Sequence, residues 1–97
     1  MYDVEYTPQA IQDLKYFPKH DQKEILDNIN IQLSYEPTVE TRNRKPMRPN
    51  SFAEWELRVG KFRVLYNVLE KVTIVEIQRI GEKQRNQFFF RGQQEEL

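Results

Sequence analysis

The chain has 97 residues, no cysteine, three glycines and a formal net charge of zero. This length predicts a single domain, residues 1–97, with one modest hydrophobic core. A chain without cysteine can form neither a disulfide nor a thiolate metal site, and the 12% of aromatic residues argues against a disordered protein.

The first ten residues, "MYDVEYTPQA", lack the basic stretch followed by an apolar run that marks a secretory signal. No apolar stretch approaches the length of a membrane span. We therefore expect a cytoplasmic protein without membrane contact.

The first part of the chain predicts one strand and two helices. "YDVEY" alternates apolar and acidic residues, which is typical of a half-buried strand. Thr7 and Pro8 are a favourable N-cap and first residue for a short helix whose apolar face would hold Ala10, Ile11 and Leu14. A longer helix is expected over residues 20–35, with Asp21 and Glu24 as a capping pair. Its apolar positions recur every four residues: Ile25, Ile29 and Leu33, with Leu26 beside them.

The middle of the chain is basic and irregular. Residues 1–40 carry a net charge of −5, whereas residues 41–63 carry +5. Residues 38–53 have no apolar periodicity, and Pro46 and Pro49 interrupt any regular element. A local block of positive charge indicates nucleic acid or an acidic protein as partner, the alternative being a solvated basic loop.

The second half of the chain predicts three antiparallel strands. "AEWELRVG" and "KFRVLYNV" alternate in polarity around the turn Gly60-Lys61, and "KVTIVEIQRIG" gives the third strand, ending at Gly81. The hairpin would bury Trp55, Leu57, Val59, Phe62, Val64 and Tyr66, and expose Glu54, Glu56, Arg58 and Arg63. In the tail we expect "EKQRNQFFF" to form a short helix or strand-like segment that packs Phe88 to Phe90, and the last five residues to be frayed.

The resulting order, β-α-α-β-β-β, predicts an α+β domain: a small antiparallel β-sheet with the two N-terminal helices packed on one face. This order, with "YFPKHDQKEIL", "RNRKPMRPN", "WELRVGKFRVLYNV" and "IQRIGEKQRNQFF", resembles the RelE/ParE superfamily of bacterial toxins from type II toxin–antitoxin systems. RelE-type members cleave mRNA on the ribosome without a metal, and ParE-type members inhibit DNA gyrase. Both are neutralised by a small antitoxin.

The resemblance implies a catalytic set on the sheet face that the helices leave open. Arg63 matches an arginine that contacts phosphate, and Lys83, with Arg85 as a substitute, would protonate the leaving oxygen. Glu56 would act as a general base toward a 2′-hydroxyl or, alternatively, neutralise Arg58 or Arg63 across the strands. The expected RNA-contacting residues are Arg42, Arg44, Lys45, Arg48, Arg58, Lys61 and, by stacking, Phe89.

The expected partners are a cognate antitoxin, the ribosome and mRNA, with DNA reached only through the antitoxin. No metal-ligand spacing and no glycine-rich phosphate loop occurs, so no cofactor is expected. Glu54 and Glu56 stand where strong ribonucleases of the superfamily have lysines, and Phe89 stands in place of a tyrosine. These differences keep two alternatives open: a gyrase inhibitor without nuclease activity, and a weakened toxin that acts as an antitoxin-bound co-repressor.

Overall fold

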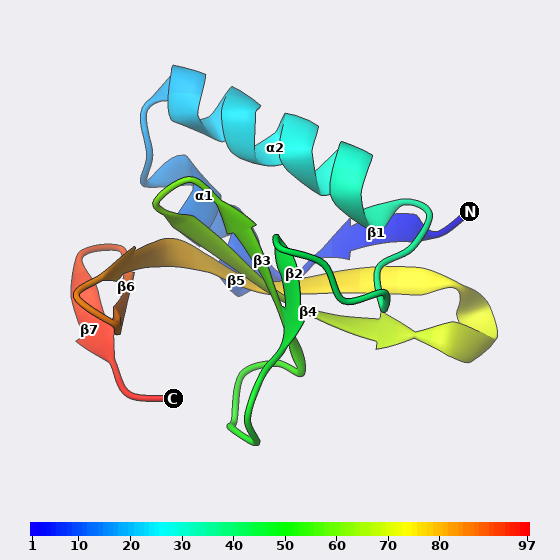
Figure 1. The fold of residues 1–97 in the computed structure, drawn as a ribbon. Helices are drawn as coiled ribbons and strands as arrows, with labels where there is room; N and C mark the ends of the chain where they lie inside the picture. Colours follow the sequence, from blue (N-terminus) through cyan, green and yellow to red (C-terminus); the bar gives the residue numbers. More distant parts are fainter.

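A computed structural model describes all residues, 1–97. Two helices pack on one face of a seven-stranded sheet, which confirms the predicted α+β architecture (Figure 1). In chain order the elements are β1 (Asp3–Tyr6), α1 (Pro8–Lys15), α2 (Lys19–Leu33), β2 (Arg44–Pro46), β3 (Trp55–Val59), β4 (Phe62–Leu69), a 3₁₀ turn (Glu70–Val72), β5 (Ile74–Gln84), β6 (Gln87–Phe90) and β7 (Gln93–Glu95).

The helix starts follow the sequence only in part. Thr7 Oγ1 accepts a hydrogen bond from the Ala10 amide at 3.1 Å, so the predicted N-cap of α1 is confirmed. The predicted capping pair of α2 is wrong, because the helix begins directly after Pro18 and has no side-chain cap. On α1, Ile11 is 41% exposed and Asp13 is fully buried, the reverse of what polarity alone predicts.

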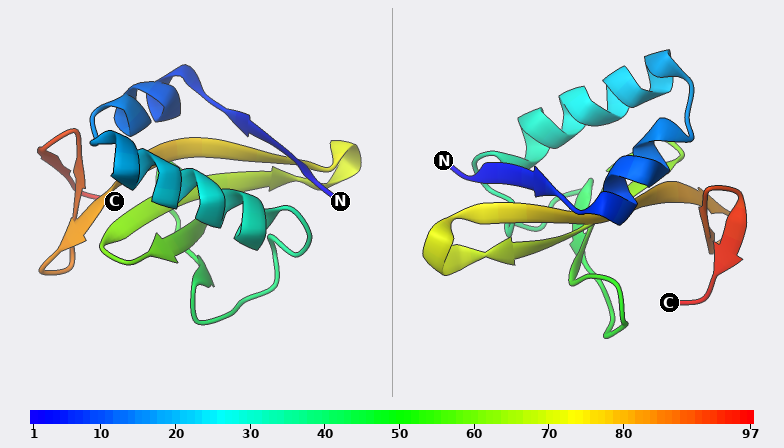
Figure 2. Two further views of the ribbon diagram at one scale, coloured as in Figure 1. Left: turned by 90° about the horizontal axis from the view of Figure 1, so that it is seen from above. Right: turned by 180° about the vertical axis from the view of Figure 1, so that it is seen from behind.

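The strands β2-β3-β4-β5-β6-β7 form a continuous antiparallel path, and β1 joins β5 in parallel (Figure 2). β5 is long enough to pair with β1 through Ile74–Ile77 and with β6 through Glu82–Gln84. Between these halves the register with β4 shifts, leaving Gln78 unpaired as a β-bulge. The bulge sets the side-chain alternation of the second half of β5, so Lys83 lies on the open face of the sheet.

The main core lies between the helices and the sheet. The helix residues Ile25, Ile29 and Leu33 are completely buried, as predicted. They belong to one cluster with the predicted apolar side of the β3–β4 hairpin: Leu57, Val59, Phe62, Val64 and Tyr66 are buried, and Trp55 packs against them half-buried. At about 1.5–3 kcal/mol for each large apolar side chain, this burial dominates the stability of the domain.

A second, smaller cluster lies on the opposite face, where Ala53, Leu65 and Phe90 are buried. The tail contributes Phe90 to this cluster because residues 87–95 form a β-hairpin, so the predicted frayed end is wrong for residues 93–95. We call β6 and β7 the C-terminal hairpin. β5 also continues past Gly81, where any Cβ would clash with the Phe90 ring. Gly81 therefore lets β6 lie tightly against β5.

The predicted irregular loop contains one short strand, β2, which pairs with β3 at the sheet edge. Pro46 is its last residue, a position that an edge strand tolerates because no neighbour needs its missing N–H. Neither helix has the length and apolar character needed to cross a membrane.

Candidate functional site

Two adjoining hollows open on the sheet face away from the helices. The first, which we call the basic cleft, has a volume of about 370 Å³ and is lined by polar residues only: Arg42, Asn43, Lys45, Glu56, Arg58, Arg63, Lys83, Arg85 and Asn86. The second, the adjoining groove, has a volume of about 720 Å³ and shares Glu56, Lys83 and Asn86 with the cleft. Together they form one continuous depression.

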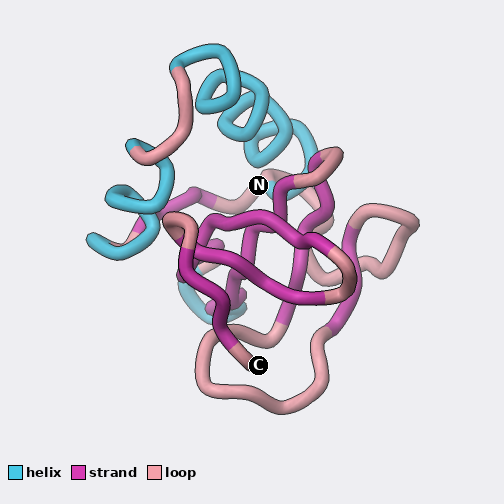
Figure 3. The backbone as a smooth tube through the Cα atoms, turned by 90° about the vertical axis from the view of Figure 1, so that its left-hand side faces the viewer, coloured by secondary structure: helices cyan, strands magenta, loops and turns pink.

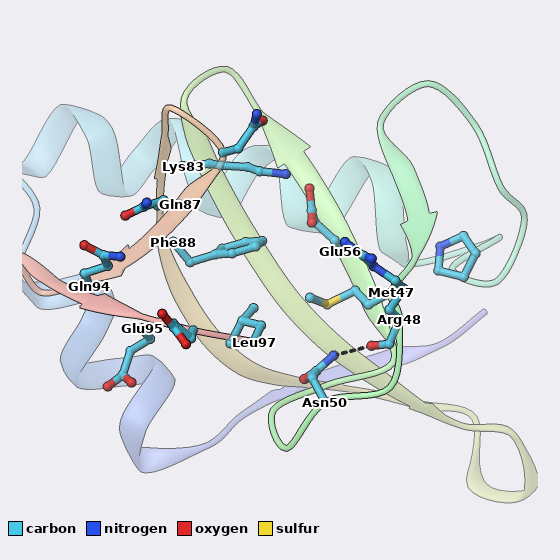
Figure 4. Close-up of a pocket in the computed structure, with 13 residues that line it drawn as sticks. Met47, Arg48, Asn50, Glu56, Lys83, Gln87, Phe88, Gln94, Glu95 and Leu97 are labelled. Atoms are coloured by element: carbon cyan, nitrogen blue, oxygen red, sulfur yellow. Dashed lines mark hydrogen bonds between the residues drawn. The ribbon is translucent and has the colours of Figure 1, made fainter.

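The walls of this depression come from distant parts of the chain. Figure 3 shows the helices on one side of the sheet and the C-terminal end of the chain on the other. In Figure 4, Lys83 and Phe88 form one wall, while Met47 and Glu56 lie across from them. The Lys83 side chain extends across the opening toward Glu56.

Strand register explains why these side chains share a face. Lys45 of β2 pairs with Glu56 of β3, and Arg58 pairs with Arg63 of β4. Arg63 pairs in turn with Gly81 of β5, where the backbone of Phe89 and the ring of Phe90 fill the place of a side chain. Because side chains alternate along strands, one face of β2 to β5 collects the cleft residues Lys45, Glu56, Arg58, Arg63 and Lys83, whereas Glu82 falls on the other face.

The cleft has a strongly positive field. Its lining contains six cationic side chains and a single carboxylate, that of Glu56. Arg58 and Arg63 are direct cross-strand neighbours, and like charges in that position repel each other. A bound anion would relieve this repulsion, so the cleft is built to accept negative charge.

The side chains of Arg63 and Glu56 are only 12% and 16% exposed, and their charges meet at the floor of the cleft. Arg63 Nε lies 3.2 Å from Glu56 Oε2, but the N–H is not aligned for a hydrogen bond. Nη1 donates to the backbone oxygens of Gly60 (2.7 Å) and Phe62 (2.9 Å). Burial lowers the pKa of Arg63, while Glu56 opposes this effect and Arg58 adds to it.

The structure brings together most of the residues predicted from the sequence. Arg42, Lys45, Glu56, Arg58, Arg63, Lys83 and Arg85 all line the basic cleft, and Arg48 lines the adjoining groove. The remaining three, Arg44, Lys61 and Phe89, lie elsewhere.

Arg44 is buried and ties the loop before β2 to α2. Its Nε donates to Val39 O at 2.9 Å, and its Nη1 donates to Gln32 O and Oε1 at 2.8 and 3.0 Å. A guanidinium engaged in this way has no free surface for RNA. The expected RNA contact of Arg44 is therefore replaced by a structural role.

Lys61 and Phe89 lie toward the helix-facing side of the sheet. Lys61 Nζ is 3.5 Å from Glu82, and Phe89 pairs with that same glutamate across β5 and β6. Phe88 takes the place expected for Phe89, since it pairs with Lys83 and lines the adjoining groove. Lys83 Nζ sits 5.1 Å from the Phe88 ring centroid, a cation–π distance.

Sequence reasoning missed Phe88 and the amides of Asn43, Asn50 and Asn86. The signal for Phe88 was present in "KQRNQF". If Arg85-Asn86 is the two-residue turn of a hairpin, Gln84 pairs with Gln87 and Lys83 with Phe88. Both turn residues have positive φ, +52° and +67°, as such a turn requires.

No group of three or more His, Cys, Asp or Glu side chains is placed to hold a metal ion. The chemistry that the cleft offers directly is that of its own side chains: one carboxylate among fixed cations beside an aromatic wall. Such a set can bind a phosphodiester and move protons next to it.

Fold and cleft together define a toxin of the RelE/ParE superfamily. The chain belongs to the ParE toxin family of type II toxin–antitoxin systems (parDE), whose model matches residues 4–87. No curated protein sequence matches the chain significantly. The chain is a toxin component of such a system.

Solved structures of two toxin–antitoxin complexes and of one isolated toxin share the fold. The RelBE2 complex from Mycobacterium tuberculosis contains a chain that is 29% identical, with a TM-score of 0.70 over 84% of this chain and 98% of that one. A chain of the archaeal RelE–RelB complex from Pyrococcus horikoshii is 24% identical, with a TM-score of 0.69 over 87% and 97%. The isolated E. coli RelE toxin is 14% identical, with a TM-score of 0.62 over 88% and 87%.

Proposed function

We propose that this toxin inhibits translation by cleaving mRNA on the ribosome, with the basic cleft as its active site. The observation that carries this proposal is the composition of the cleft: six cations and one carboxylate on the sheet face free of helices. The phosphodiester backbone of RNA is the polyanion that fits this field.

In the proposed reaction the 2′-hydroxyl attacks the adjacent phosphorus, and the bond to the 5′-oxygen breaks. The products are a 2′,3′-cyclic phosphate and a 5′-hydroxyl. Arg63 and Arg58 stabilise the charge that develops on the phosphorane. Glu56 takes the proton from the 2′-hydroxyl, and Lys83, with Arg85 beside it, supplies the proton for the leaving oxygen.

The contact between Arg63 and Glu56 fits a site that rearranges when substrate binds. At 3.2 Å and without an aligned hydrogen bond, the pair is less firmly held than a bidentate one. A phosphate oxygen that binds Arg63 would replace Glu56 as its counter-ion. The carboxylate would then be free to accept the proton of the 2′-hydroxyl.

The surrounding residues supply affinity in the proposal. Arg42 and Lys45 add positive charge around the cleft, and Arg48 adds one in the adjoining groove, which also holds Glu95 and Glu96. Phe88 offers a ring face on which a base can stack, an interaction typically worth about 1–3 kcal/mol. We further propose a cognate antitoxin as partner, contact with DNA only through it, and action in the cytoplasm.

A second candidate function is inhibition of DNA gyrase without nuclease activity. It is favoured by the family model that matches the chain, which is that of ParE toxins. In this alternative the cleft would bind an acidic surface of the target protein, and Glu56 would only moderate its charge.

Parallel assays of translation and supercoiling distinguish the two functions. The purified toxin is added to a reconstituted translation reaction and to a gyrase reaction at equal concentration. We expect mRNA cleavage that requires ribosomes, together with unaffected supercoiling. Inhibited supercoiling with intact mRNA would overturn the proposal and establish the alternative.

A further inference from the structure

The most completely bonded charge of the molecule lies outside the cleft. Asp13 of α1 is 0% exposed, and it accepts hydrogen bonds from Arg79 Nε (2.7 Å), Arg79 Nη2 (3.2 Å) and the Ile80 amide (3.0 Å). Arg91 Nε, from the turn between β6 and β7, lies 3.0 Å from its second oxygen. Nothing in the proposed chemistry uses this cluster.

The cluster joins the C-terminal hairpin to α1. Arg91 also donates to Gln12 Oε1 at 2.9 Å and to Gln9 Oε1 at 2.7 Å. One arginine at the tip of the hairpin therefore binds three side chains of a single helix. Gly92, next to it, lies against Tyr16, the C-cap residue of the same helix.

The same cluster supports the wall of the adjoining groove. The Arg79 guanidinium lies 4.4 Å from the Phe90 ring centroid, and the Phe90 ring is stacked parallel to that of Phe88, with centroids 6.2 Å apart. Phe88 is the aromatic wall of the groove and contacts Lys83 of the cleft. A continuous path of packed side chains thus runs from Asp13 through Arg79 and Phe90 to the groove.

We propose that Asp13 is a positioning residue for the adjoining groove. Through Arg79 and Arg91 it holds the C-terminal hairpin in place, and the hairpin in turn holds Phe88 and its partner Lys83 at the geometry that binds RNA. That the ligand is RNA rests on the proposed function. Asp13 itself touches no part of the cleft, so its effect is exerted entirely through the hairpin.

Arg91→Gln is the most informative variant. It removes the hairpin's ionic contact with α1 but leaves Asp13 bonded to Arg79 and Ile80, so no buried carboxylate loses all its partners. Lys71→Gln is the matched control, because it removes one exposed positive charge from the β4–β5 turn, far from the hairpin. Arg91→Lys is the conservative variant and keeps a cation beside Asp13.

Two measurements are made on each full-length variant. Amide hydrogen exchange reports the protection of residues 87–95 relative to β3 and β4, and fluorescence anisotropy reports affinity for a labelled single-stranded RNA. For Arg91→Gln we expect at least tenfold faster exchange in the hairpin alone and about three- to tenfold weaker binding. Arg91→Lys should recover part of both, and Lys71→Gln should match the wild type.

Unchanged hairpin protection in Arg91→Gln, or reduced protection with wild-type RNA affinity, would overturn the inference. Arg63→Ala separates this failure from failure of the proposed function. If Arg63→Ala loses RNA binding while Arg91→Gln keeps it, only the positioning role is wrong. If the wild type and Arg63→Ala bind RNA equally, the cleft is not the RNA site and the proposed function is wrong.

Discussion

The molecule contains two carboxylate–arginine pairs that differ in almost every respect. Asp13 is fully buried and receives aligned hydrogen bonds from Arg79 and from a backbone amide, with Arg91 at ion-pair distance. The Glu56–Arg63 pair is also shielded from solvent, but its closest approach is 3.2 Å and Arg63 Nε has no hydrogen-bond acceptor.

This difference indicates that the Asp13 pair stabilises the fold and that the Glu56–Arg63 pair belongs to the functional site. A buried carboxylate with all its acceptor sites used has nothing left to offer a ligand, so Asp13 holds elements together. A shielded guanidinium with an unused donor costs free energy in the unbound protein. That cost is recovered when an anion binds, which is why we place the chemistry at Arg63 and the anchoring at Asp13.

The largest expected effect comes from removing Asp13 from its pair with Arg79. Asp13→Ala leaves the Arg79 guanidinium, whose side chain is only 15% exposed, without its carboxylate, and removing one member of a buried ion pair costs about 3–5 kcal/mol. We expect the free energy of unfolding, measured by urea denaturation, to fall by that amount. If the free energy of unfolding falls by less than about 1 kcal/mol, Asp13 does not have the structural role that distinguishes its pair from Glu56–Arg63.

The next effect concerns Glu56 as a base. Because general-base catalysis contributes about 10²–10⁴-fold, Glu56→Gln should slow ribosome-dependent cleavage about a hundredfold while changing stability little. RNA affinity should rise, since the amide no longer neutralises Arg63. Glu54→Gln is the control, because Glu54 is exposed and lines neither the cleft nor the adjoining groove. Unchanged cleavage by Glu56→Gln would make Glu56 structural only.

Arg63→Ala should weaken RNA binding about tenfold and reduce toxicity with the fold intact, since a charge-assisted hydrogen bond is worth about 1.5–3 kcal/mol. Lys61→Ala removes a neighbouring cation from the opposite face and should have no such effect. Binding is measured by anisotropy and folding by circular dichroism. Full toxicity of a folded Arg63→Ala protein would refute the assignment.

The smallest expected effect is on salt dependence. For a single strand, each phosphate that the protein no longer neutralises reduces the log–log slope of affinity against salt by about 0.7. Arg85→Gln should therefore flatten the slope by about that value, if Arg85 binds one phosphate. An identical slope for the variant and the wild type would place Arg85 outside the binding surface.

Local patterns are sufficient to predict the helices, the β3–β4 hairpin and its charged face, because alternation and turn chemistry act over a few residues. They also place Arg63 on that face, whereas the choice of Lys83, on β5, follows from the resemblance to the RelE/ParE superfamily. The parallel pairing of β1 with β5 does not follow from such patterns, since it depends on how the helices return the chain to the sheet.

The errors at single residues arise from register and from distant partners. The choice of Phe89 over Phe88 is an error of one residue, and such a shift moves a side chain to the other face of a sheet. The burial of Asp13 is invisible in the helix itself, because its partners, Arg79 and Arg91, come from far along the chain. The structural role of Arg44 is hidden for the same reason, since two of its acceptors lie on α2.

The most direct test of the cleft is the mapping of mRNA ends by primer extension in a reconstituted translation reaction. The wild-type toxin, Arg63→Ala and Lys61→Ala are compared with and without ribosomes. We expect ribosome-dependent cuts with the wild type and Lys61→Ala, and at least tenfold fewer with Arg63→Ala. Equal cleavage by Arg63→Ala, or intact mRNA with all three proteins, would contradict an RNA-cleaving site in the basic cleft.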